Sequence, residues 1–315
     1  MSNEALSAIS KDYSPVLDDF PKIIPVYNSS KERKNSSVIN LNGSWVPGNN
    51  IDKTLKLMIS NNLTWAVKKI FDSKEACALL ERSGIKSLHF IGDSYVRQVY
   101  AATLLTVTGD YELGAVSSSS CAGEAQFEDR HCRQFMVKEK TACDGKISFH
   151  LVHGIDYDGQ CQNNYCDPNT LVIWSGGAHG IGPNKETRYG VNNAFAYYTR
   201  RIRPSELCKS PQRTLWLSTH ARATLPNQYF FEDEIHEYVE KFANDLQKYL
   251  ALEECQNFYY VDVYNMTDSL VSKYNRTELR DLKVTYDGVH YGRTVNLLKV
   301  QIILNYILLI FNSNS

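Results

Sequence analysis

The chain has 315 residues, of which 43% are hydrophobic and 22% are charged, with 34 Lys and Arg against 35 Asp and Glu. This composition excludes collagen-like, low-complexity and wholly disordered chains, and the balanced charge argues against a nucleic acid or an anionic membrane surface as partner. The length is that of one large α/β domain, or of a domain with an appendage.

The first 50 residues are rich in Ser, Asn, Lys and Pro, and they predict an irregular N-terminal arm. Residues 51–315 are expected to form a single larger domain. No basic segment followed by an apolar one is visible at the start, so no secretory signal is recognised. If the chain is secreted, it is a fragment or a truncated gene product.

Eight cysteines are more than a cytosolic enzyme of this size usually carries, and none belongs to a Cys-x-x-Cys pair. Disulfides therefore fit better than a zinc site, and they indicate an oxidising compartment such as that of a secreted protein. Six Asn-x-Ser/Thr sequons point weakly the same way. The alternative is a set of free thiols in a reducing cell.

From residue 51 onward, short apolar runs alternate with helical periodicities. Strands are predicted at 87–91, 147–152, 171–174, 214–218 and 258–263, and helices at 73–82, 95–107, 192–201, 232–252 and 292–311. This alternation predicts a mostly parallel sheet with helices on both faces. The segment 116–146 shows little periodicity and is expected to be a loop that covers one edge or the functional site.

Two of the predicted helices carry further signals. The first is expected to take Asp72 or Ser73 as its N-cap and to stop at Gly84. The last contains the longest apolar stretch, 295–311, which is interrupted by Asn and Gln residues and by Lys299. This content predicts a buried core helix and not a membrane span.

The turn after the first predicted core strand holds a candidate nucleophile. Residues 92–94 read Gly-Asp-Ser, so Gly92 permits a tight turn and Ser94 falls at the N-terminus of the next helix. Free backbone N–H groups at that point stabilise an oxyanion, and ligands of open α/β sheets bind at this edge. The alternative is that Ser94 only caps the helix.

A serine hydroxyl needs a base that is held by a third group. Asp287 and His290 stand three residues apart in a predicted turn directly before the last helix. Such a turn lets the carboxylate orient the imidazole while the other ring nitrogen faces a serine. The sequence therefore predicts a Ser94, His290 and Asp287 triad.

These two motifs resemble the SGNH/GDSL hydrolase superfamily, and more closely its PC-esterase branch, which includes polysaccharide and sialate O-acetyltransferases. The first motif, 92–98, reads Gly-Asp-Ser-x-x-Arg-Gln, and the second reads Asp-x-x-His. The resemblance covers residues 51–311 approximately. It implies a three-layer α/β/α sandwich, SGNH-hydrolase-like, with a mostly parallel central sheet, and an acyl-enzyme formed on Ser94.

The resemblance also implies an oxyanion hole. The wider superfamily uses the serine N–H, a glycine and an Asn of a Gly-x-Asn block; here the corresponding block contains Gly177 and His179 in a Gly-x-His-like element. Arg97, one helical turn after Ser94, is the donor expected to replace the Asn. The alternative for Arg97 is an arginine at the surface or paired with a carboxylate.

Two further histidines follow predicted strands. His179 and His220 are each expected to contact substrate or to hold a loop. His150 and His153, on opposite faces of a predicted strand, do not make a convincing metal pair.

Three functions fit the sequence. The first is a serine-dependent O-acetyltransferase that acts on a glycan, the second an esterase that hydrolyses acetylated carbohydrates or small esters, and the third a non-catalytic glycan-binding member of the fold. The first two need an acyl donor or ester, such as acetyl-CoA or an acetylated intermediate, as a co-substrate, with no permanently bound cofactor or metal. A membrane-anchored partner, or a membrane segment outside this sequence, is expected to supply the donor.

Overall fold

The computed structural model describes residues 38–39, 71–128, 130–153, 167–175, 211–221, 257–271, 284–285, 287 and 289–312. The helices predicted at 192–201 and 232–252 lie outside these residues, as does most of the predicted N-terminal arm. Within the arm, residues 38–39 form a short strand.

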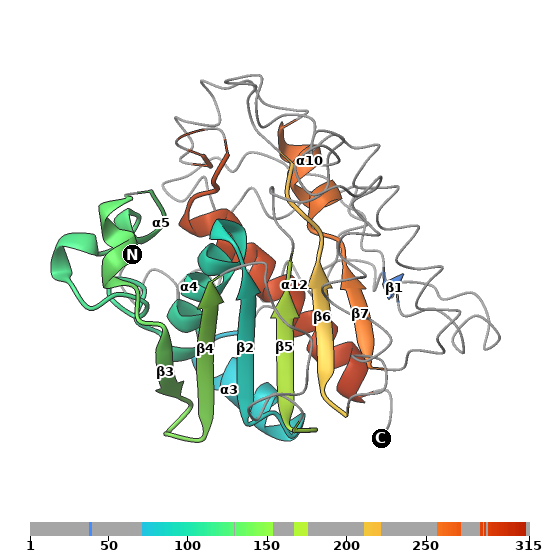
Figure 1. Ribbon diagram of the computed structural model, residues 1–315. Helices are drawn as coiled ribbons and strands as arrows, with labels where there is room; N and C mark the ends of the chain where they lie inside the picture. Colours follow the sequence, from blue (N-terminus) through green and yellow to red (C-terminus); the bar gives the residue numbers. More distant parts are fainter. Residues whose placement is uncertain are drawn as a thin grey trace, which may run out of the picture.

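A seven-stranded sheet runs through the described part of the chain in the order β1-β7-β6-β5-β2-β4-β3 (Figure 1). Its strands are β1 (Val38–Ile39), β2 (Ser87–Gly92), β3 (Glu139–Ala142), β4 (Ile147–His153), β5 (Thr170–Trp174), β6 (Arg213–Leu217) and β7 (Phe258–Val261). All neighbours pair in parallel except β3, which runs antiparallel to β4 at one edge. The predicted α/β fold with a mostly parallel sheet is confirmed.

The central strands are buried on both faces. All five residues of β5 are buried, and successive side chains of a strand point to opposite faces. Ile173 and Leu215, neighbours in register, belong to the main core cluster, whereas Trp174 and Trp216 pack with ring centroids 5.3 Å apart on the other face. Because both faces of β5 and β6 are covered, these strands are apolar at successive positions and do not alternate with polar residues.

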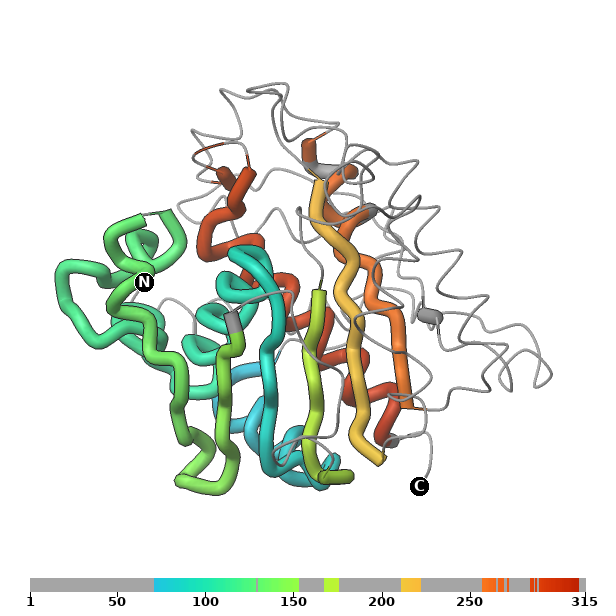
Figure 2. The backbone as a smooth tube through the Cα atoms, in the orientation of Figure 1, coloured from blue at the N-terminus to red at the C-terminus, as the bar shows by residue number. Residues whose placement is uncertain are grey.

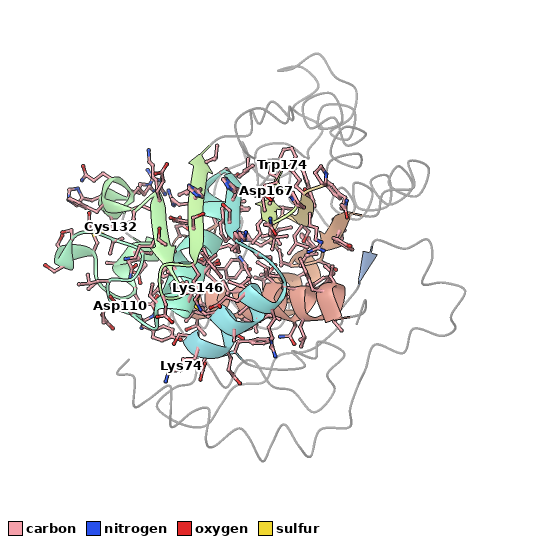
Figure 3. The ribbon with its side chains drawn as sticks, turned by 90° about the horizontal axis from the view of Figure 1, so that it is seen from below. Lys74, Asp110, Cys132, Lys146, Asp167 and Trp174 are labelled. Carbon is pink, nitrogen blue, oxygen red and sulfur yellow. A yellow bond between two sulfur atoms is a disulfide. The ribbon has the colours of Figure 1, made fainter. Side chains whose placement is uncertain are left out.

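Three helices pack on one another over one face of the sheet: α3 (Ser73–Arg82), α4 (Ser94–Thr108) and α12 (Arg293–Asn312). Figure 3, seen from below, shows α3, which carries Lys74, and α12 on the same side of the strands. Asp72 caps α3 through a capping box with Glu75, so the first of the two predicted caps is the one used. A shorter helix, α10 (Tyr264–Val271), follows β7.

Among the described helices, α12 is the one that is long and apolar enough to cross a membrane. Its buried residues include Leu298, Ile302 and Tyr306, and 67% of the apolar window is buried inside the protein against α3 and α4. In this structure α12 is a core helix, as its polar interruptions predict.

Two disulfides hold the described segments together. Cys77 of α3 is bonded to Cys143 in the turn between β3 and β4, and Cys121 is bonded to Cys132, which is labelled in Figure 3. The second bond closes a segment with helix α5 (Ala125–Glu128) and two 3₁₀ turns, Ser119–Cys121 and His131–Phe135. These bonds are consistent with a secretory or extracellular location. The other four cysteines lie outside the described residues.

The carboxyl ends of β2, β4, β5, β6 and β7 lie at one edge of the sheet (Figure 1). From β2 the chain passes to β4 on one side and later returns to place β5 on the other, so the end of β2 is a topological switch point. Ligands of open α/β sheets bind at such points. Figure 2 shows that α4 and α12 both begin near this edge.

Candidate active site

The turn between β2 and α4 requires glycine at position 92. Gly92 has φ +154°, and an added Cβ would lie 2.5 Å from Val96 Cγ2 and 2.6 Å from the Ser175 carbonyl oxygen. The backbone of Ser175 also donates to the Ile91 carbonyl at 3.2 Å, which extends the pairing of β5 with β2 beyond the strands. Close approach of β5 and α4 therefore leaves no room for a side chain at this turn.

Asp93 caps α4, and Ser94 is the first residue of the helix. The Asp93 carboxylate accepts from Tyr95 N–H at 2.9 Å. Ser94 is partly exposed, whereas Tyr95 and the next twelve residues of α4 are buried. The alternative prediction for Ser94, a helix cap, is therefore not the arrangement found here. Its hydroxyl opens to the carboxyl edge of the sheet.

The imidazole of His290 lies against Ser94. Its Nε2 is 2.9 Å from Ser94 Oγ, and its Nδ1 is 2.7 Å from Asp287 Oδ2. The side chain of His290 is 18% exposed, so the hydroxyl and the imidazole are both reachable from solvent. The structure thus brings together the three residues that the sequence groups as a triad, although 196 positions separate Ser94 from His290.

Asp287 shapes the loop that presents His290. Its Oδ1 accepts from the backbone N–H of Val289 at 2.8 Å and of His290 at 2.7 Å, while Oδ2 receives the ring. The Thr285 hydroxyl donates to the His290 carbonyl at 2.7 Å and closes the loop from the other side. Asp287 therefore fixes both the backbone and the imidazole of His290, and Thr285 fixes its carbonyl.

The pKa of Asp287 is set by two opposing effects. Burial raises it, but the hydrogen bonds from the His290 ring and from the backbone N–H groups of His290 and Val289 outweigh burial. The pKa of this carboxyl therefore lies well below its ordinary value, and Asp287 remains a carboxylate at neutral pH. A carboxylate at Nδ1 fixes the hydrogen of His290 there and leaves the Nε2 lone pair toward Ser94.

Two hydrogen-bond donors of the first turn of α4 are candidates for binding an anion beside Ser94. The Ser94 N–H is at the first helical position and has no acceptor among the described residues. Arg97 lies one turn later on the same face of α4, and helical side chains lean toward the N-terminus. Arg97 is 6% exposed, yet its guanidinium makes no hydrogen bond or salt bridge within the described residues.

Arg97 keeps its charge in this setting. Burial, and secondly the charge of Arg133, lower its pKa to about 10, and Asp93 partly opposes this. A cation that is nine-tenths buried without a paired carboxylate is costly to hold. Of the alternatives that the sequence left open for Arg97, a surface position does not describe it, and no carboxylate among the described residues forms a salt bridge with it.

His220 lies beneath the site and not on its surface. It follows β6, is 1% exposed, and its Nε2 donates to the Val289 carbonyl at 2.7 Å. Of the two predicted roles, contact with substrate and support of a loop, this position favours support. Gly177 and His179, the other predicted oxyanion and substrate residues, lie outside the described residues.

Sequence reasoning missed Tyr95 and Lys299 as parts of this region. The ring of Tyr95 stacks on His220 at 3.6 Å and meets His290 edge-on at 5.9 Å. Lys299 Nζ lies 2.8 Å from His220 Nδ1. The sequence did hold a signal for Lys299: a lysine within an apolar helix that is expected to be buried needs a buried polar partner.

No three His, Cys, Asp or Glu side chains in the described ranges lie close enough together to hold a metal ion. His150, considered and set aside as a metal ligand, instead stacks on His89 across β4 and β2 at 4.5 Å. Compared with models of known protein families and with curated proteins, the chain shows no significant match.

Proposed function

We propose that this protein is a serine-dependent O-acyltransferase that moves an acetyl group to a carbohydrate hydroxyl through an acyl-enzyme on Ser94. The observation that carries the proposal is the continuous chain of hydrogen bonds from Ser94 Oγ to His290 Nε2 and from His290 Nδ1 to Asp287. Ser94 lies at the N-terminus of α4, on the carboxyl edge of the sheet, and this position supports the same conclusion.

The proposed fold is a three-layer α/β/α sandwich of the SGNH type. Burial of both faces of β5 and the packing of α3, α4 and α12 over one face support it. The proposed location is the Golgi lumen or the extracellular space, and the disulfides Cys77–Cys143 and Cys121–Cys132 support it.

In the first half-reaction, Ser94 Oγ attacks the carbonyl carbon of the acyl donor while His290 Nε2 takes the hydroxyl proton. The tetrahedral oxyanion accepts hydrogen bonds from the Ser94 N–H and from Arg97. The bond to the leaving group then breaks, and His290 returns the proton to that group. The product is an ester between Ser94 and the acetyl group.

In the second half-reaction, His290 takes a proton from a sugar hydroxyl, whose oxygen attacks the Ser94 ester. Collapse of the second oxyanion breaks the bond to Oγ, and His290 gives the proton back to Ser94. Asp287 stabilises the imidazolium in both steps without being protonated. The same cycle with water as acceptor is ester hydrolysis, so the acceptor decides between transferase and esterase.

The proposal is tested by incubating the protein with isotope-labelled acetyl-CoA or an acetylated phenol and with a panel of neutral and acidic oligosaccharides. Mass spectrometry is expected to find the label first on the peptide that contains Ser94 and then on a sugar hydroxyl. If the label is recovered only as free acetate, the protein is an esterase and not a transferase. A protein that binds oligosaccharides and never carries label on Ser94 is the non-catalytic member, and the proposal is then wrong.

A further inference from the structure

A buried cluster supports the inner side of the loop that carries His290. It consists of His220, Lys299, Tyr95 and Tyr291, and we refer to it as the buttress. His220 and Lys299 are each 1% exposed, so neither reaches solvent or a bound substrate. They come from different elements, the segment after β6 and the buried face of α12.

The hydrogen bonds of His220 select one form of its ring. Nε2 lies 2.7 Å from the Val289 carbonyl oxygen, and Nδ1 lies 2.8 Å from Lys299 Nζ. A carbonyl only accepts and an ammonium only donates, so Nε2 carries the hydrogen and Nδ1 presents its lone pair. Because both nitrogens are engaged, His220 acts on the loop and not on a reacting atom.

Lys299 fixes the far side of this bond. Its Nζ also lies 3.3 Å from Asn296 Oδ1 and 5.0 Å from the centre of the Tyr291 ring. Asn296 in turn donates to the Tyr291 carbonyl at 2.8 Å and to the Gly292 carbonyl at 3.0 Å. The first turns of α12 thus hold both the buttress and the end of the His290 loop.

His220 is also connected to Ser94 and His290 through contacts of aromatic rings. Tyr95, the residue after Ser94, is 4% exposed and lies between His220 and His290, stacked on the first and edge-on to the second. Tyr291, the residue after His290, meets His220 edge-on at 4.7 Å and donates to the Ala221 carbonyl at 2.7 Å. A shift of His220 therefore displaces a neighbour of each reacting residue.

We propose that His220 and Lys299 are positioning residues that set the distance between Ser94 Oγ and His290 Nε2, an inference that rests on the proposed function. The lysine donates to the ring of His220, the ring holds the Val289 carbonyl, and this carbonyl fixes the residue before His290. A displacement of about 1 Å between reacting groups costs on the order of 100-fold in rate. The buttress keeps that distance within hydrogen-bonding range.

The test uses a fluorophosphonate, which Ser94 attacks with loss of fluoride while His290 takes the proton. The double variant His220→Phe with Lys299→Met removes both polar groups together, keeps an aromatic ring against Tyr95, and replaces the lysine by an apolar side chain of similar length. Its labelling rate is expected to fall 10- to 100-fold at an unchanged half-saturating reagent concentration, with cooperative unfolding retained. His220→Gln, whose amide donates to Val289 and accepts from Lys299, is expected to label at least 10-fold faster than the double variant.

His89→Phe is the matched control. Leu88 and Phe90 share the core cluster with α4, so His89, the buried residue between them, points to the other face of the sheet. His89→Phe is expected to label at the wild-type rate. If the wild-type protein is not labelled at Ser94, the proposed function fails. If wild type is labelled and the folded double variant labels equally fast, or the Gln variant is no faster than the double variant, the positioning role is wrong.

The ring form of His220 offers a second test, which is read on the unsubstituted protein, with a variant needed only to assign the resonances. In protein labelled with ¹⁵N-histidine, the His220 resonances, assigned by their loss in His220→Gln, are expected to show a protonated Nε2 and an unprotonated Nδ1 at neutral pH. A hydrogen on Nδ1 contradicts donation from Lys299 and overturns the proposal, even if the double variant fails to fold.

Discussion

The carboxylate of Asp93 accepts the Tyr95 N–H at 2.9 Å, and this bond keeps Ser94 out of the capping position of α4. A serine at the cap turns its hydroxyl back onto the helix backbone. One position further on, the hydroxyl of Ser94 instead meets His290 Nε2 at 2.9 Å. Because Asp93 caps the helix, the Ser94 hydroxyl is available to bond to His290.

Replacement of Asp93 tests this division of roles. Asp93→Ala is expected to lower the free energy of unfolding by about 1 to 2 kcal/mol, the usual cost of losing a helix cap. Asp93→Asn keeps an oxygen that accepts from Tyr95 and is expected to lose much less. Chemical denaturation of both variants measures the difference, and equal losses contradict the capping role.

Ser94→Ala is expected to abolish labelling by a fluorophosphonate and all acetyl transfer, with almost no loss of stability, because a partly exposed hydroxyl contributes little to the core. Ser119→Ala is the matched control, since Ser119 is an exposed serine in the segment closed by Cys121–Cys132. It is expected to label as wild type. Transfer that persists in Ser94→Ala contradicts the acyl-enzyme.

Arg97→Met separates an anion-binding role from a structural one. Loss of an oxyanion donor is expected to lower kcat about 100-fold with little change in KM. The melting temperature is expected to stay the same or rise, because the variant removes a buried charge that has no paired carboxylate within the described residues. Arg82→Met on α3 is the control. A large drop in melting temperature assigns Arg97 to the framework instead.

Asp287→Asn is expected to lower the stability of the protein near neutral pH but not in acid. The folded-state pKa of Asp287 lies below its ordinary value, so the unfolded chain binds more protons in this range and stability rises with pH. The contribution is complete above about pH 5 and is lost as pH falls below about 4, near the unfolded value. Melting temperatures of wild type and Asp287→Asn are therefore expected to converge on acidification. A gap that widens in acid contradicts the depressed pKa.

The two disulfides are expected to differ in their contribution. Cys77 and Cys143 are 66 residues apart, and loss of this bond is expected to cost roughly 4 kcal/mol in the loop-entropy model. Cys121 and Cys132 are 11 residues apart, which corresponds to roughly 3 kcal/mol in the same model. Denaturation of the two paired Cys→Ser variants measures both, and the reverse order contradicts an entropic origin.

The central strands were predictable because each is a continuous apolar run between turn residues, which only a doubly covered strand requires. The edge strand β3 was missed: its residues, Glu139 to Ala142, are mostly polar because it pairs on one side only. The same segment was expected to be a loop, and its short helix and turns are too brief for a periodicity to develop.

At the candidate site, chain order predicted the grouping of Ser94, His290 and Asp287, because a strand end and the last loop of a parallel sheet share one edge. The role of His220 was not predictable to the same degree. A histidine after a strand reaches either the site or the interior, and the bond to Lys299 that selects the interior comes from a helix 79 residues away. Two side chains that meet across such a distance along the chain produce no recognisable motif in the sequence.

The separation of Ser94 from His290 along the chain also has a consequence during synthesis. Ser94 begins α4, directly after β2, whereas His290 belongs to the loop before α12, so the hydroxyl leaves the ribosome well before the imidazole. Until the loop before α12 is in place, the Ser94 hydroxyl cannot bond to His290. If Ser94 is the proposed nucleophile, a chain that has not yet placed the His290 loop beside α4 therefore lacks the base that would activate it.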